Sequence, residues 1–283
     1  MNRDEVKYHR EAKSNLLPLY LKNVSMGKVH SKFNSGLNLQ MEEHLLYIGC
    51  CSSPLSAFGL NIDEAKLRQL LAAVRIGDLV RYKEDVLIFY SIQGTITLAC
   101  QELAEVDLRL PAIACTRQKI ADSRLYNYLA AMEFEPFIGI DLDEQAGRHV
   151  ELLQSTDKTD GNANSRVIRF FVGRGKGLTP SGDDLLIGFT LALLLFGPFQ
   201  AWKQALAGEV TGERTTLISV AYCRALLAGY ASEPFIRLVK LLDTEELAAI
   251  EKTIKEVQAF GHTSGNDTLF GFFLGLKFII HGG

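Results

Sequence analysis

One short block occurs twice in the chain and limits how the chain can fold. Residues 181–193 read SGDDLLIGFTLAL and residues 264–276 read SGNDTLFGFFLGL, and the two align without a gap. Each copy has a polar head, Ser-Gly-(Asp/Asn)-Asp, followed by an apolar run typical of a helix that is buried on all sides. Such helices need a surrounding shell, so the sequence predicts a helical domain built around the two copies.

Small residues recur four positions apart in both predicted helices. The first helix carries Gly188 and Ala192, and the second carries Gly271 and Gly275. Small residues at this spacing let two helix backbones approach closely. We therefore expect the two repeat helices to cross there, which would place both polar heads at the same end.

The part of the chain before the repeats has a different pattern. Alternating apolar residues over 29–33 and 37–41, joined by a turn at 34–36, predict a hairpin, and Asp63 is expected to cap a helix over 63–74. Further strands are expected up to 106–114, and helices follow one another from about residue 118. The predicted class is α+β, with a β-rich domain over 1–117 and a helical-bundle domain over 118–283 that carries the two repeat helices.

Composition narrows the range of partners and compartments. The net charge of −3 gives no general attraction for nucleic acid or acidic membranes. The apolar runs 185–199 and 269–280 fall short of the roughly 18 residues of a membrane span. The polar start, residues 1–9, lacks a signal-peptide core. We expect a cytoplasmic protein whose five cysteines are reduced and mostly buried: Cys50, Cys51, Cys100, Cys115 and Cys223.

The heads permit a purely structural interpretation. Ser181 with Asp184, and Ser264 with Asp267, match the spacing of a capping box, in which the acid reaches back to the amide of the cap. Capping does not require glycine at the second position of both heads, where it costs about 1 kcal/mol relative to alanine in a helix. Close approach of a ligand or of another backbone would explain those glycines.

A glycine-rich loop precedes the first head. Gly173, Gly175 and Gly177 alternate with Arg174 and Lys176. Alternating glycines can expose successive amides as an anion nest, and a helix start adds free amides and a positive dipole end. The loop therefore indicates a site for phosphate or carboxylate, with the two cations as a source of full charge. An exposed basic pair that is simply solvated is the plainer alternative.

Several familiar motifs lie close to this pattern without matching it. Gly-x-Gly-x-Gly differs from the Gly-x-Gly-x-x-Gly of dinucleotide folds, and the chain contains no P-loop. The histidines lack metal-ligand spacing, and the sequence predicts neither a cofactor nor a bound metal. His262, beside the second head, is the natural acid–base candidate. Arg214, Thr215 and Thr216 either contact a ligand or form a hydroxyl-rich helix start.

Three stretches together resemble a known family. They are GRGKGLTPSGDD at 173–184, Arg-Thr-Thr at 214–216 and GHTSGNDTLFG at 261–271. They resemble a bacterial family, long described only as a domain of unknown function, that is linked to the third subunit of the three-component oxamate carbamoyltransferase of anaerobic allantoin breakdown. The motif-bearing resemblance covers about residues 165–280.

The resemblance implies a reaction and partners. In that reaction oxalurate and phosphate interconvert with oxamate and carbamoyl phosphate, and the activity belongs to a complex with other subunits. It implies a small anionic substrate held at the two helix starts. The catalytic candidates are Asp183, Asp184, His262 and Asp267. The binding candidates are Gly173, Arg174, Gly175, Lys176, Gly177, Thr179, Ser181, Gly182, Arg214, Thr215, Thr216, Ser264, Gly265 and Asn266.

Two other functions remain open on the sequence. One is a noncatalytic anion-binding or assembly subunit that uses the same heads. The other is a metal-dependent hydrolase that uses Asp183, Asp184 and Asp267.

Overall fold

The computed structural model describes residues 10–113 and 116–281. Residues 1–9, where the sequence predicts no signal peptide, and Cys115 lie outside the described residues. The chain divides into two compact units, one formed by the described part of 1–109 together with 230–233, and the other by 110–229 together with 234–283. A strand-rich part precedes a helical part, so the predicted α+β class is confirmed. The boundary at residue 117 stays a prediction.

In its described residues, the first unit is a sheet with two α-helices and one short 3-10 helix. Its elements are β1 (Ala12–Ser14), α1 (Leu17–Leu21), β2 (Met26–Phe33), β3 (Gly36–Met41), β4 (His44–Cys50), β5 (Gly59–Ile62), α2 (Glu64–Ala73), β6 (Leu79–Lys83), β7 (Val86–Ser91), β8 (Gly94–Ala99), η1 (Cys100–Glu102) and β9 (Ala104–Val106). Within the described residues the strands form one nine-stranded sheet in the order β8-β7-β6-β2-β3-β4-β5-β1-β9. Neighbouring strands are antiparallel except for the pairs β4–β5 and β1–β9.

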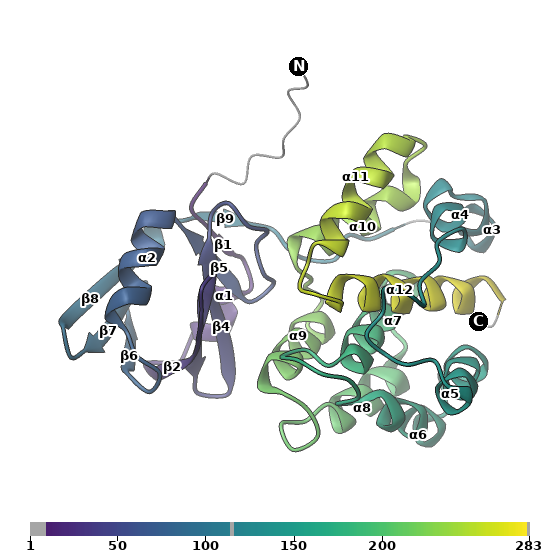
Figure 1. Ribbon diagram of the computed structural model, residues 1–283, viewed down its shortest axis with the longest axis horizontal. Helices are drawn as coiled ribbons and strands as arrows, with labels where there is room; N and C mark the ends of the chain where they lie inside the picture. Colours follow the sequence, from purple (N-terminus) through teal and green to yellow (C-terminus); the bar gives the residue numbers. More distant parts are fainter. Residues whose placement is uncertain (1–9, 114–115, 282–283) are drawn as a thin grey trace. The chain divides into compact units, whose positions relative to one another are not determined.

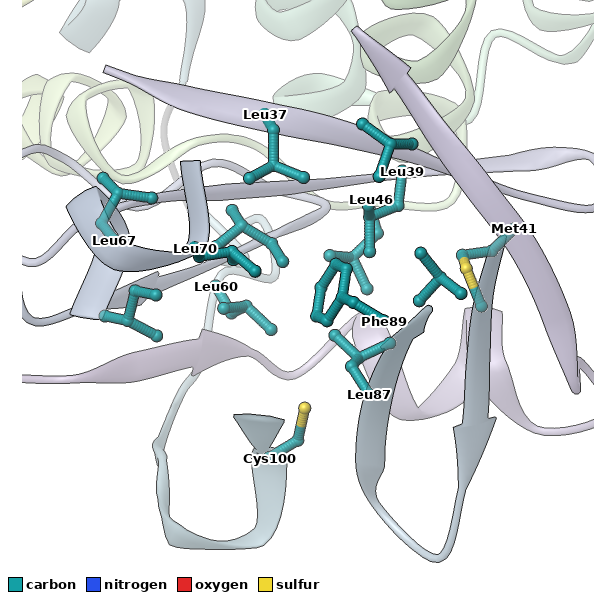
Figure 2. Packing of buried hydrophobic residues seen from close by; sticks show 14 of the residues in the cluster. Leu37, Leu39, Met41, Leu46, Leu60, Leu67, Leu70, Leu87, Phe89 and Cys100 are labelled. Atoms are coloured by element: carbon teal, nitrogen blue, oxygen red, sulfur yellow. The ribbon is translucent and has the colours of Figure 1, made fainter. Parts of the chain in front are cut away.

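Alternation of apolar residues builds the core of this unit. The predicted hairpin forms as β2 and β3, and Leu37, Leu39 and Met41 are fully buried on one face. Figure 2 shows these side chains packed with Leu67 and Leu70 of α2. Asp63 caps α2 as predicted, because its carboxylate accepts from the amide of Ala65 at 2.8 Å.

The strand predicted over 106–114 is wrong for the residues that the structure describes. β9 ends at Val106, and the next pairing is a single bridge between Arg109 and Tyr230. Leu108 is buried, and its carbonyl accepts from the amide of Ala231. This stretch thus pairs with residues 230–231, from a later part of the chain, instead of continuing strand β9.

The second unit is helical. Its elements are α3 (Arg117–Asp122), α4 (Arg124–Ala130), α5 (Glu144–Ser155), α6 (Gly161–Phe171), α7 (Ser181–Phe196), α8 (Gln200–Glu209), α9 (Leu217–Leu227), α10 (Glu233–Lys240, whose first residue belongs to the first unit), η2 (Leu241–Asp243), α11 (Leu247–Gln258) and α12 (Ser264–His281). The repeat helices α7 and α12 run side by side through the middle of this unit (Figure 1). Across the described residues, none of the helices has the length and apolar character needed to cross a membrane.

The two repeat helices touch backbone to backbone, as the small-residue spacing predicts. A Cβ at Gly188 would lie 1.9 Å from the carbonyl oxygen of Thr268, and a Cβ at Gly271 would lie 2.0 Å from that of Leu185. Gly188 and Gly271 are equivalent positions of the repeat, as are Leu185 and Thr268. The contact is therefore symmetric. Further along both helices, a Cβ at Gly275 would lie 2.6 Å from the Cβ of Ala192, and at their starts Thr179 Oγ1 lies 2.8 Å from Ser264 Oγ, so the helices run parallel with both heads at one end.

A buried lysine packs among the far ends of the repeat helices. Lys158 Nζ donates to the carbonyls of Leu153 and Thr156, each at 2.8 Å, and lies 4.6 Å from the ring centre of Phe278 and 5.4 Å from that of Phe189. Burial lowers the pKa of Lys158 to about 7. The ammonium is compensated by carbonyl dipoles and aromatic faces, which join the α5–α6 connection to α7 and α12.

The crossing predicts the cost of adding one methyl group. Gly188→Ala should lower the free energy of unfolding by about 1–3 kcal/mol or more, because the new Cβ meets rigid backbone. Gly208→Ala in α8 is the control, since nothing lies within 4 Å of its added Cβ and alanine favours a helix by up to about 1 kcal/mol. Urea denaturation measures both. Equal stability of the two variants would contradict the close crossing.

Candidate functional site

The two heads meet at one end of the α7–α12 pair. Thr179 Oγ1 lies 2.8 Å from Ser264 Oγ, and this contact joins the loop before α7 to the first residue of α12. The hydroxyls of Ser264 and Thr179 favour the ionised form of Asp184, while those of Thr263 and Ser181 do so for Asp267. The serine of each head thus favours the ionised form of the other head's carboxyl, and the second hydroxyl comes from the loop before that carboxyl's own helix.

This reciprocal arrangement replaces the capping box in α7. The N-cap of α7 is Pro180, which makes no side-chain cap bond, and Ser181 is already the first helical residue. The carbonyl of Pro180 accepts from the amides of Asp183 and Asp184, at 2.9 and 3.2 Å. The capping-box interpretation is therefore wrong for Ser181 and Asp184, whose side chains serve the contact between helices.

The glycines in the two heads are explained by close backbone packing. A Cβ at Gly182 would lie 2.1 Å from the carbonyl oxygen of Phe171, at the end of α6, and a Cβ at Gly265 would lie 1.9 Å from that of Val257, in the last turn of α11. The amide of Gly182 donates to the carbonyl of Arg174 at 2.8 Å. That amide is occupied within the fold, so it is not an open donor for an anion.

The difference between Asp183 and Asn266 has a structural cause. Asp183 Oδ1 accepts from the amide of Gly173 at 2.8 Å, and its other oxygen accepts from the hydroxyl of Thr215. Asn266 instead accepts from the side-chain amide of Gln258 at 3.0 Å. The carboxylate anchors the longer glycine loop, residues 172–180, whereas the shorter connection, residues 259–263, needs only an amide.

Burial raises the pKa of all three head carboxyls. Asp183, Asp184 and Asp267 are 2, 5 and 0 % exposed, and desolvation is the main cause of each shift. The pKa of Asp184 is raised well above its usual range, and the nearby carboxyls of Asp267 and Asp183 add to the effect. Asp184 Oδ2 and Asp267 Oδ2 have no hydrogen-bond partner among the described residues.

A pocket of about 730 Å³ opens beside the heads, within the helical unit. Both repeats contribute to its walls, together with the segment between α4 and α5. Its lining residues are Gly139, Ile140, Asp141, Asp143, Arg174, Gly175, Lys176, Gly177, Ser181, His262 and Thr263. Hydroxyls, cations, carboxylates and one imidazole therefore share a single hollow, which suits a small polar ligand.

The sequence-derived candidates divide between the pocket and the packing around it. The pocket wall includes Arg174, Gly175, Lys176, Gly177, Ser181 and His262. The remaining candidates do not line it: Gly173, Thr179, Gly182, Asp183, Asp184, Arg214, Thr215, Thr216, Ser264, Gly265, Asn266 and Asp267. Sequence reasoning missed the segment from Gly139 to Asp143, which has no motif.

Of the two basic side chains in the loop, Arg174 is held in place by contacts with the described residues and Lys176 is not. The Arg174 guanidinium stacks 3.9 Å from the ring centre of Phe170, and its Nε donates to the carbonyl of Phe170 at 3.2 Å. Lys176 is exposed and makes no hydrogen bond or ion pair with the described residues. Positive φ at Gly173, Gly175 and Gly177 lets the loop fold back on itself around these side chains. Lys176 is thus the cation free to reach a ligand.

The Arg-Thr-Thr stretch, residues 214–216, packs against the glycine loop, residues 172–180. Arg214 pairs with Glu209 at 3.5 Å, and its carbonyl lies against Gly173. Thr216 caps α9 by accepting from the amide of Ser219, and its hydroxyl donates to the carbonyl of Leu178. These contacts fit the hydroxyl-rich helix start that was the alternative to ligand binding.

The positions of the three head aspartates test whether they could hold a metal ion, as the hydrolase alternative requires. Asp183 is bound to Gly173 and Thr215, and Asp267 accepts from the amide of Gly139 at 2.8 Å. Over residues 10–113 and 116–281, no three His, Cys, Asp or Glu side chains are grouped so that they could hold a metal ion. The geometry gives the metal-dependent alternative no support.

Comparison with known proteins matches both parts of the chain. A family model described as oxamate carbamoyltransferase subunit AllH matches residues 171–276, which include both heads. A second model, described as the AllH family N-terminal domain, matches residues 9–105. No solved structure matches the chain.

The buried carboxyl of Asp184 predicts a pH dependence. Well below about pH 4 the side chain is neutral in both states. As pH rises, the unfolded chain ionises first, so Asp184 makes the folded state progressively less stable. Asp184→Asn removes this contribution. The stability of this variant relative to wild type should therefore rise from about pH 4 upward, by at most about 1.4 kcal/mol per pH unit. Denaturation at several pH values measures the slope, and a flat difference would contradict a buried neutral carboxyl.

Proposed function

Because the chain belongs to the AllH family, we propose that it is a cytoplasmic subunit of an oxamate carbamoyltransferase and that its pocket binds a small anionic amide. The observation that carries the proposal is the convergence of both repeats on one pocket that holds Lys176 and His262. The family models support the reaction class, and the pocket is where we propose that the ligand binds.

The lining suits the two ends of such a ligand. Carbamoyl phosphate, oxamate and oxalurate each combine an anionic group with an amide group. Lys176, with Arg174 behind it, can neutralise the anion, and the exposed carboxylate of Asp141 can accept from the amide N–H. A pocket with cations and carboxylates in its wall therefore fits a molecule that is anionic at one end and a donor at the other.

The transfer needs one proton to move. The carbamoyl carbon loses its bond to a phosphate oxygen and gains one to the oxamate nitrogen, and that nitrogen gives up a proton. His262 is exposed in the pocket wall and is the group we assign to this proton. The hydroxyls of Ser181 and Thr263 lie in the same wall and can donate to the oxygen that gains charge in the transition state.

A noncatalytic anion-binding subunit is the second candidate. It is favoured by the burial of Asp183, Asp184 and Asp267, which leaves three of the four catalytic candidates outside the pocket wall. In that case the same pocket would hold a regulatory or structural anion, and the partner subunits would carry out the transfer.

Ligand binding tests the shared part of both proposals. We expect isothermal calorimetry with carbamoyl phosphate, phosphate, oxamate and oxalurate to detect binding of at least one compound, and Lys176→Ala to weaken it about tenfold or more by removing the free cation. Lys203→Ala, in α8, is a control for the loss of one positive charge. Equal affinities for the two variants, or no binding by wild type, would contradict the pocket assignment.

Turnover of the reconstituted complex separates the two candidates. If the pocket is catalytic, His262→Asn should lower kcat by about 100-fold or more, with little change in KM, because a proton acceptor is lost while the binding groups remain. Unchanged kcat in a fully assembled complex would favour the noncatalytic subunit.

A further inference from the structure

One buried carboxyl connects three separate walls of the pocket. Asp267, in the first turn of α12, is completely buried, and its Oδ1 accepts from the amide of Gly139 at 2.8 Å. Burial raises the pKa of this carboxyl, and the hydroxyls of Thr263 and Ser181 act in the opposite direction. Gly139, Thr263 and Ser181 all line the pocket, whereas Asp267 lies behind them.

The three walls are in direct contact at this point. A Cβ at Gly139 would lie 2.2 Å from Ser181 Oγ and 2.8 Å from Thr263 Oγ1, so the bare backbone of Gly139 rests on both hydroxyls. These residues come from the α4–α5 connection, the first turn of α7 and the loop before α12. Their shared neighbour is the Asp267 carboxyl, which can set where all three lie.

The equivalent carboxyl of the first repeat has no such position. Asp184 is also buried, at 5 % exposure, and its neighbouring hydroxyls come from Ser264 and Thr179. Neither Ser264 nor Thr179 lines the pocket. The repeat therefore supplies two carboxyls of similar burial and chemistry, of which one adjoins the pocket wall.

We propose that Asp267 is a positioning residue that holds the Gly139 backbone and the Ser181 and Thr263 hydroxyls in the geometry needed for the ligand, and that Asp184 has no such role. The ordering of the wall stands on the contacts alone, while its consequence for a ligand rests on the proposed function. Asp184 and Asp267 occupy equivalent positions of the repeated block, so the difference between them comes from the fold.

Hydrogen exchange tests the positioning without any ligand. In Asp267→Ala the amide of Gly139 loses its acceptor, so exchange in the peptide that covers residues 137–141 should become about tenfold faster or more. Asp184→Ala is the matched control and should leave this peptide close to wild type even where it lowers overall stability. Equal acceleration in both variants would mean that the effect is general loosening of the heads, and would overturn the proposal.

The conservative variant separates the two functions of the carboxyl. In Asp267→Asn the side-chain oxygen can still accept from the amide of Gly139, but the negative charge beside the hydroxyls of Ser181 and Thr263 is lost. Exchange of the 137–141 peptide should return toward wild type, while affinity for the best ligand found by calorimetry should stay reduced about tenfold or more. Asp184→Asn should bind that ligand within about twofold of wild type.

A second variant approaches the same wall from the other side, in case the Asp267 variants do not fold. Gly139→Ala keeps the carboxyl but drives a methyl group into Ser181 Oγ, so the hydroxyl must move and ligand affinity should fall. Unchanged affinity in both Asp267→Asn and Gly139→Ala would overturn the role toward the ligand. If wild type binds none of the compounds, the proposed function fails, and the exchange comparison still decides whether Asp267 orders the wall.

Discussion

The backbone contact between α7 and α12 is the constraint on which the helical unit depends. At Gly188 and Gly271 each helix places a carbonyl where any larger residue would need its Cβ. Such a contact fixes both the separation and the axial register of the two helices, because a shift along the axis would drive a side chain into backbone. The register brings the first turns level, and the hydroxyl of one head then reaches the carboxyl of the other.

Glycine contacts within each half of the helical pair, together with two unequal loops, explain why two similar heads produce one pocket. Each head begins the second helix of a helix–loop–helix unit, α6–α7 or α11–α12. In both units the glycine of the head packs on a backbone carbonyl of the first helix. The loops differ: residues 172–180 carry three glycines with positive φ, and residues 259–263 form a short connection. Asp183 is needed to anchor the longer loop, which exposes Lys176. Unequal loops on a symmetric scaffold thus give the pocket its polarity.

The elements with a local signature could be predicted from the sequence. The cap at Asp63, the hairpin over 29–41 and the crossing at Gly188 and Gly271 each follow from residue types at fixed spacing. The role of Gly139 could not be predicted, because it acts through a backbone amide and the absence of a side chain.

The capping box shows a different limit of sequence reasoning. A serine three residues before an aspartate can form a capping box within its own helix or contact a neighbouring helix. Only the register of α7 against α12 decides which of these two arrangements forms. The preceding helices α6 and α11 likewise complete each repeat without sharing a pattern that the sequence reveals. Where the partner of a group lies far away in the chain, its function is set by the fold.

The buried carboxyls are better explained by geometry than by stability. An apolar pair in place of Asp184 and Asp267 would avoid the cost of desolvating two acids, one oxygen of each lacking a hydrogen-bond partner among the described residues. A carboxyl nevertheless offers what an apolar side chain cannot, namely an acceptor that faces several donors in fixed directions. At Asp267 those donors line the pocket, so the stability lost there is compensated by a defined wall for a ligand.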